Sequence, residues 1–276
     1  MWSREKKFGR FGEQGMEEQS IGRSDFSEPL TLKEIADAFR DKGLDLVVDD
    51  FKAEEDLTVL GVRPMVFRIG ETENKLFVYL YQSLEERKNA SEKIRASKAP
   101  KTFFEKRITT RYFPAKNALI MYHIVYYPEE TPWERFGDEF SKVRDVVFWD
   151  LNEGKEIVFK GESPHWGAQV TLQYYEHFWK DDRGVVRHEN DYIQKSILRY
   201  KGSKPEEIKE IYYRFETAGP SCSGKLEQPH FSKDGTISVG SGGGSGGHIP
   251  RENDIYNVKI EWNGQEETFE LRALIQ

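Results

Sequence analysis

The order of apolar and polar residues divides the chain into two parts with different periods. Over residues 31–127, helix-like spacings of apolar residues alternate with strand-like runs. From residue 156 onwards only strand-like runs occur, and glycine-, proline- and asparagine-containing turns separate them. This pattern predicts an α+β fold with an N-terminal α+β domain, a bridging helix and a C-terminal antiparallel β-sandwich.

The first part contains two predicted helices and five predicted strands. The helix over residues 31–43 begins with Thr31 and Glu34 as a capping box and ends at Gly43. The helix over residues 83–97 repeats the capping-box pattern with Ser83 and Glu86. The predicted strands are residues 44–51, 62–69, 75–82, 107–113 and 118–127. We therefore place an α+β domain at residues 28–130, after a mobile tail at residues 1–27.

A third helix is predicted to connect the two parts. Thr131 is placed at its N-cap and Pro132 at its first helical position. This bridging helix is assigned to residues 131–154, and the sandwich to residues 155–276. About seven strands are expected in the sandwich, and Asn263-Gly264 predicts a type I′ turn between the last two. Such a set of short antiparallel strands is typical of an immunoglobulin-like sandwich.

Residues 240–248, GSGGGSGGH, contain a GxGxxG pattern at Gly242, Gly244 and Gly247. That pattern binds a dinucleotide only where a strand precedes it and a helix N-terminus follows. Here Pro250 and a predicted strand follow instead. The segment is therefore interpreted as a wide, flexible loop between strands, and an engineered insert is the alternative.

Composition restricts the possible functions. The chain of 276 residues has a net charge of −7 and a pI near 5.6, which argues against a general nucleic-acid-binding protein. Its single cysteine, Cys222, excludes an intramolecular disulfide and a multi-cysteine metal site. The longest apolar run, residues 118–127, is far shorter than the ~20 residues that cross a bilayer. No signal peptide is visible at the start of the chain.

Catalytic and metal-binding patterns are weak. Histidines occur at positions 123, 165, 177, 188, 230 and 248, and no pair has the spacing of a helical zinc motif. No cysteine-protease signature surrounds Cys222. The sequence therefore predicts no catalytic residue, no cofactor and no metal site.

Positive charge is concentrated in residues 87–116. This stretch has ten Lys and Arg residues against Glu92 and Glu105, a local charge of +8, which leaves −15 for the rest of the chain. Such a stretch is either a solvated helix face followed by a loop or a patch that binds an anionic surface. The candidate binding residues are Arg87, Lys88, Lys93, Arg95, Lys98, Lys101, Lys106, Arg107 and Arg111.

Three segments of the β-rich part carry a resemblance to a known group of proteins. KGESPHW at residues 160–166, the glycine- and serine-rich segment at 240–248 and the WNGQEETFEL hairpin at 262–271 resemble uncharacterised surface lipoproteins of Bacillus-type Gram-positive bacteria. The hairpin VRPMVFRI–KLFVYLYQ and the helix after it are similar to small domains of such lipoproteins. The resemblance implies a β-sandwich at the cell surface and implies no reaction. The chain departs from the pattern because it shows no lipobox cysteine.

Three function classes follow. The first is a non-enzymatic cell-surface protein, peripheral to the membrane at most, whose basic patch binds an anionic envelope component or a protein partner. A cytoplasmic location is its alternative, because no export signal is visible. The second is a small-ligand or carbohydrate-binding module, and the third is a hydrolase of unknown type. No nucleic-acid partner is expected. The aromatic residues considered for a carbohydrate are Trp166, Tyr174, Tyr175 and Trp179.

Overall fold

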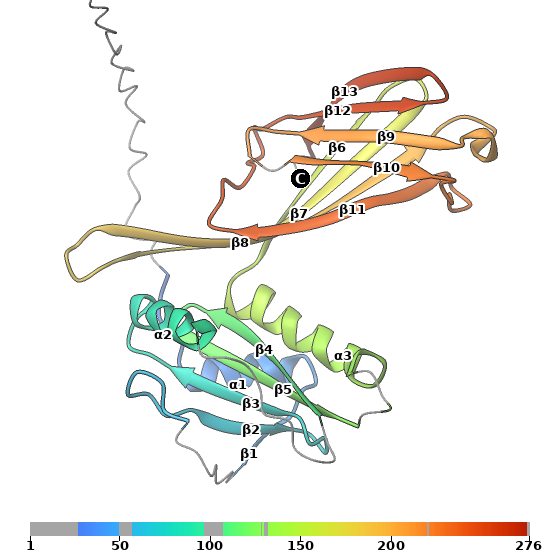
Figure 1. Ribbon diagram of the computed structural model, residues 1–276. Helices are drawn as coiled ribbons and strands as arrows, with labels where there is room; N and C mark the ends of the chain where they lie inside the picture. Colours follow the sequence, from blue (N-terminus) through green and yellow to red (C-terminus); the bar gives the residue numbers. More distant parts are fainter. Residues whose placement is uncertain are drawn as a thin grey trace, which may run out of the picture.

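The computed structural model describes residues 27–49, 57–96, 107–127, 129, 132–219 and 221–274. The described chain is mostly antiparallel β, arranged in two separate sheets, with helices beside the first sheet (Figure 1). The α+β class and the β-rich, sandwich-like C-terminal part are therefore confirmed. The predicted tail lies outside the described residues except for Ser27.

The first sheet has the strand order β1-β2-β3-β5-β4, with every neighbouring pair antiparallel. Helix α1 begins at the predicted capping box, in which the Glu34 amide donates to the Thr31 hydroxyl and the Thr31 amide donates to the Glu34 carboxylate. Ile35 and Phe39 of α1 pack into the core of this sheet. The elements are α1 (Leu32–Asp41), β1 (Leu46–Val48), β2 (Met65–Ile69), β3 (Lys75–Leu80), α2 (Leu84–Ala96), β4 (Arg107–Ala115) and β5 (Ala118–Tyr126).

The predicted bridging helix belongs to the first core. It consists of α3 (Pro132–Asp145) and a π-helical continuation, η2 (Val146–Leu151). Its buried residues Phe136, Val143 and Val147 lie in the same apolar cluster as α1 and the first sheet. The α+β part therefore leads into the first strand of the sandwich directly from its own core.

The second sheet has eight strands in the order β10-β9-β12-β13-β6-β7-β8-β11, folded into two layers (Figure 1). The layers are joined through a short pairing of β13 with β6, where Arg272 faces Lys160. A Cβ atom on Gly161 would lie 2.0 Å from the Glu270 carbonyl oxygen, so only glycine permits this close join. The strands are β6 (Lys155–Glu162), β7 (Trp166–Lys180), β8 (Val186–Tyr200), β9 (Glu210–Glu216), β10 (Ser221–Glu227), β11 (Thr236–Ser245), β12 (Tyr256–Trp262) and β13 (Gln265–Ala273).

The prediction of a flexible loop over the glycine-rich segment is wrong for residues 240–245. These residues continue β11 and pair with β8, from Gly240 opposite Ser196 to Ser245 opposite Asp191. The register shifts between Ser238 and Gly240, and Gly240 has a φ of 150°, which suits glycine. Strand β10 has mostly small or polar residues, and its sequence therefore gives no hydrophobic alternation that would predict a strand.

Strands β7 and β8 extend beyond the sandwich and reach the α+β part (Figure 1). We call residues 174–192, which form this end of the hairpin, the arm. Trp179 donates its indole N–H to Glu85 at 2.9 Å, and the Tyr175 ring lies 5.6 Å from the Phe148 ring. The arm thus joins the two parts of the molecule through the buried Tyr175 and Trp179, which contact the half-buried Phe148 and Glu85.

Candidate functional site

The predicted basic stretch is not one continuous surface. Arg87 is buried, with 2% of its surface exposed. Its Nε donates to the Lys116 carbonyl oxygen at 2.7 Å, and its guanidinium pairs with Glu189 of the arm. The prediction that Arg87 binds an external anion is therefore wrong, because the arm covers it and supplies its counter-charge.

The other candidates of this stretch are spread over several elements. The Lys88 Nζ atom lies 5.6 Å from the centroid of the Trp179 ring, while Lys93 and Arg111 are exposed. Arg95 and Arg107 lie in α2 and β4, but their side chains are outside the described part. Lys98, Lys101 and Lys106 lie outside the described residues. Anion binding by these residues stays a prediction.

The aromatic platform considered for a carbohydrate is wrong. Trp166 and Tyr174 point into the sandwich core, and Tyr175 and Trp179 are covered by the α+β part. All four are buried, so none offers a free ring face. Alternation along β7 sends successive side chains to opposite faces, but here both faces are covered.

A buried polar cluster lies where the arm meets the α+β part. His177 contacts Asn152 Oδ1 through Nε2 and Ser27 Oγ through Nδ1, both at 2.8 Å. Because Asn152 Oδ1 is an acceptor, Nε2 carries the hydrogen and Nδ1 accepts from the Ser27 hydroxyl. Burial, with the charges of Lys116 and Arg87 acting in the same direction, lowers the pKa of His177 to about 4.

The arrangement of Ser27, His177 and Asn152 resembles a nucleophile, a base and the residue that orients the base. Two features favour a structural role. The Ser27 amide donates to the Phe178 carbonyl oxygen, so it is not free to stabilise an oxyanion. An imidazole whose pKa is about 4 is also a weak base near neutral pH. The cluster therefore ties the start of the described chain to the arm.

The KGESPHW turn is fixed to the last hairpin of the sandwich by one carboxylate. Glu267 accepts from the Ser163 hydroxyl at 2.5 Å and contacts His165 Nδ1 at 2.6 Å. Burial alone would raise the Glu267 pKa, but the hydrogen bonds from Ser163 and His165 outweigh it and lower the pKa. Within the described ranges, no group of three or more His, Cys, Asp or Glu side chains is placed to hold a metal ion.

The outer face of β6, β7 and β8 carries exposed cations around a hollow of about 390 Å³. We call the exposed residues Lys160, Lys195, Arg199 and Lys201 the basic face. Lys201 pairs with Glu162 at 3.3 Å, whereas the other three have no carboxylate partner among the residues that the structure describes. Gly167 lies opposite Arg199 and lines the hollow. Because Gly167 has no side chain, the hollow is deeper at this position.

Sequence reasoning missed the basic face because its cations are not neighbours in the chain. In β8, Lys195 and Arg199 share a face and alternate with core-facing residues such as Leu198. Lys160 reaches them only through the register, which places it opposite Gln169, itself opposite Ile197. In the sequence, cations alternate with core residues in two predicted strands, which indicates that the cations are exposed. This pattern does not show that the two strands lie close together in the sheet.

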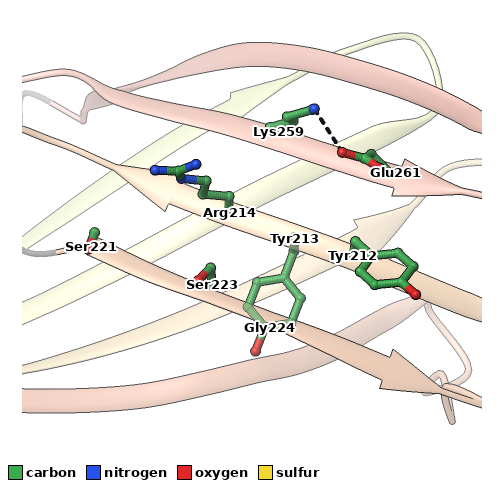
Figure 2. Close-up of a pocket in the computed structure, with 8 residues that line it drawn as sticks. All are labelled: Tyr212, Tyr213, Arg214, Ser221, Ser223, Gly224, Lys259 and Glu261. Carbon is green, nitrogen blue, oxygen red and sulfur yellow. Dashed lines mark ion pairs between the residues drawn. The ribbon is translucent and has the colours of Figure 1, made fainter.

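A second hollow, of about 430 Å³, lies on the outer face of the other layer (Figure 2). Tyr212 and Arg214 project from β9, between the short Ser221 and Ser223 of β10 and the charged residues of β12. The two hollows therefore lie on opposite faces of the same sandwich.

The fold and these surfaces define an α+β protein with a two-layered β-sandwich that exposes one basic and one mixed-charge face. Neither a protein-family model nor a curated protein matches the chain. No helix in the described part of the chain is long and apolar enough to cross a membrane.

Proposed function

We propose that this chain is a non-catalytic cell-surface binding protein whose basic face takes an anionic, phosphate-bearing component of the cell envelope. The observation that carries the proposal is a hollow lined by Lys160 and Arg199, two exposed cations that have no carboxylate partner among the described residues. Lys195, also exposed and without such a partner, lies further along the same face of β8. An unpaired cation offers its full charge to a ligand, whereas a cation with a carboxylate partner offers little.

The chemistry of the hollow favours phosphate. A phosphodiester oxygen only accepts hydrogen bonds, and guanidinium and ammonium groups only donate them. The Gln169 amide, whose NH₂ can also donate, lines the same hollow. A chain whose overall charge is −7 repels an anion elsewhere, so this local positive face would orient the ligand.

The predicted layout is part of the proposal: an α+β domain at residues 28–130, a bridging helix at 131–154 and a sandwich at 155–276. The strand order departs from an immunoglobulin-like arrangement. Strands β6, β7 and β8 are consecutive neighbours in one layer, whereas the immunoglobulin arrangement places its third strand in the opposite layer.

One binding experiment distinguishes two sources of phosphate, a wall-type polymer and lipid headgroups. Full-length protein is mixed with soluble poly(glycerol phosphate), or with vesicles that contain phosphatidylglycerol. Substitution of Lys160→Gln together with Arg199→Gln should weaken binding about tenfold or more, because each removes a charge-assisted contact. The control Lys225→Gln removes a cation that is already paired with Glu227 at 2.8 Å, and it should leave binding unchanged.

The affinity for the preferred source should also fall as salt is raised from about 50 to 200 mM, since exposed charges are screened. Binding to the polymer alone identifies a wall-type ligand, and binding to the vesicles alone identifies lipid headgroups. The proposal fails if neither probe binds, or if the double variant binds as tightly as the unaltered protein.

A further inference from the structure

The second hollow differs from the basic face in its charge. On the outer face of β10, β9 and β12, each cation already has a carboxylate partner: Lys259 contacts Glu261 at 2.7 Å and Glu266 at 3.1 Å. Arg214 pairs with Glu216, and this ion pair is also exposed. Lys225 contacts Glu227 at 2.8 Å and Glu210 at 3.2 Å.

These ion pairs comprise three cations and five carboxylates, so this part of the face has an excess of negative charge. Such an excess disfavours an anionic ligand. The ion pairs still offer hydrogen bonds to a neutral ligand. The Arg214 guanidinium and the Lys259 ammonium donate, the Glu261 carboxylate accepts, and the Ser221 and Ser223 hydroxyls do both. Ligand hydroxyls, which also donate and accept, match such a mixed set.

Tyr212 adds an apolar contact at one end of this set, beside Glu261 (Figure 2). Its side chain is 43% exposed, although it lies on an inner strand of the layer rather than at an edge. The Lys225 Nζ atom lies 5.1 Å from the ring centroid and limits the positions that the ring can adopt. An aromatic ring held beside hydrogen-bonding groups presents an apolar body next to polar partners.

The floor of the hollow is kept low by small side chains. Ser223 lies opposite Arg214, and Gly224 lies opposite Tyr213, the neighbour of Tyr212 that faces the core. A Cβ atom on Gly224 would lie 2.4 Å from the Tyr213 hydroxyl oxygen, so this glycine makes room for the Tyr213 ring on the core side of the layer. Figure 2 shows Arg214 beside the short serines of β10, and Tyr212 beside Glu261 of the Lys259–Glu261 pair of β12.

We propose that this hollow is a second binding site, for a neutral saccharide whose ring packs on Tyr212 and whose hydroxyls bond to Arg214, Lys259 and Glu261. The aromatic ring packs on the C–H groups of the sugar ring, while the ion pairs bind its hydroxyls. This site is independent of the proposed phosphate site, which lies on the opposite face of the sandwich.

The test is a titration of ¹⁵N-labelled full-length protein with two soluble probes, an N-acetylglucosamine tetramer and a glucose tetramer, both β-1,4-linked. Amide signals of β9, β10 and β12 should shift with at least one probe. The substitution Tyr212→Ala should weaken that binding about tenfold or more, as should Arg214→Gln. Raising the salt concentration should leave the affinity unchanged, because the ligand is neutral.

The matched control is Tyr112→Ala, which removes a tyrosine of similar exposure (39%) from β4 of the α+β part. It should leave saccharide binding unchanged. The proposal is overturned if neither probe shifts these signals, if Tyr212→Ala retains full affinity, or if Tyr112→Ala weakens binding equally. Lys160→Gln should not alter saccharide binding, so failure of the phosphate site and failure of this site give different results.

Discussion

At the scale of single residues, two histidines are held neutral by their surroundings. Burial lowers the pKa of His123 to about 4, and the positive charge of Lys75 acts in the same direction. His177 has a pKa of about 4 for similar reasons, since burial and the charges of Lys116 and Arg87 outweigh Glu153 and Glu176. Both values lie below the ordinary histidine value of about 6.5.

These values determine how stability changes with pH. The unfolded chain takes up a proton on each histidine as the pH falls below about 6.5, but the folded chain does so only near pH 4. Stability is therefore lost as the pH falls from 6.5 towards 4. Between pH 7.5 and pH 5, each histidine should reduce the free energy of unfolding by about 2 kcal/mol.

Urea unfolding at the two pH values measures this loss. The variant His177→Asn should show about half of the pH dependence of the unaltered protein, because His123 still titrates. Exposed His230 provides the control, and His230→Asn should keep the full dependence. An unfolding free energy that is equal at pH 7.5 and pH 5 in the unaltered protein would contradict this account.

At the scale of elements, β11 shows what a glycine-rich strand requires. A Cβ atom on Gly243 would lie 2.6 Å from the Tyr192 carbonyl oxygen of the neighbouring strand β8. At Gly242, a Cβ atom would meet nothing within 4 Å. Neighbouring glycines of one strand therefore differ sharply in their tolerance of a side chain.

The substitution Gly243→Ala should cost about 1–3 kcal/mol, because β8 and β11 must separate to accommodate the methyl group. The matched substitution Gly242→Ala should change stability by less than about 1 kcal/mol and in the favourable direction, since alanine restricts the unfolded chain. Thermal unfolding of both variants measures the difference. Equal effects of the two substitutions are the result expected of an open loop, and they would contradict the strand.

An ion pair between Arg87 of α2 and Glu189 of β8 also holds the arm against the α+β part. The Arg87 side chain is nearly fully buried, so removal of its partner leaves a buried charge. Glu189→Gln should therefore cost about 3 kcal/mol and accelerate amide hydrogen exchange in residues 174–192. Glu227→Gln, which removes an exposed ion pair with Lys225, should cost about 0.5 kcal/mol or less and leave exchange in the arm unchanged. Equal exchange in both variants would show that the pair does not hold the arm.

Much of the fold was predictable because local signals agreed with it. The Thr31 capping box starts α1 where the sequence placed it. The dipeptide Asn263-Gly264 has positive φ at both residues, as a type I′ turn requires. By contrast, β10, the first half of β8 and the end of β11 escaped prediction, because their polar and glycine residues lack hydrophobic alternation and their pairing comes from distant strands.

The candidate sites were less predictable than the fold. A run of charge in the sequence indicated residues 87–116, but tertiary contact buried Arg87 beneath the arm. The cations of the basic face come from β6, β8 and the residue after β8, and only the register brings them together. Tyr212 is one of two successive tyrosines in β9, and the structure alone shows which of them faces solvent.

At the scale of the whole molecule, the sandwich presents two outer surfaces of opposite character. The basic face has cations without carboxylate partners, while the face around Tyr212 has cations that are all paired. The arm and the polar cluster around His177 fix the sandwich to the α+β part. These contacts orient both faces of the sandwich relative to the α+β part.

The most direct test of the phosphate-binding proposal is a map of where poly(glycerol phosphate) touches the protein. Amide signals of ¹⁵N-labelled full-length protein are followed while the polymer is added. The account predicts the largest shifts in residues 158–162, 167–171, 195–201 and 236–241, which surround the hollow of the basic face. Largest shifts in residues 87–116, or no shifts at any polymer concentration, would contradict it.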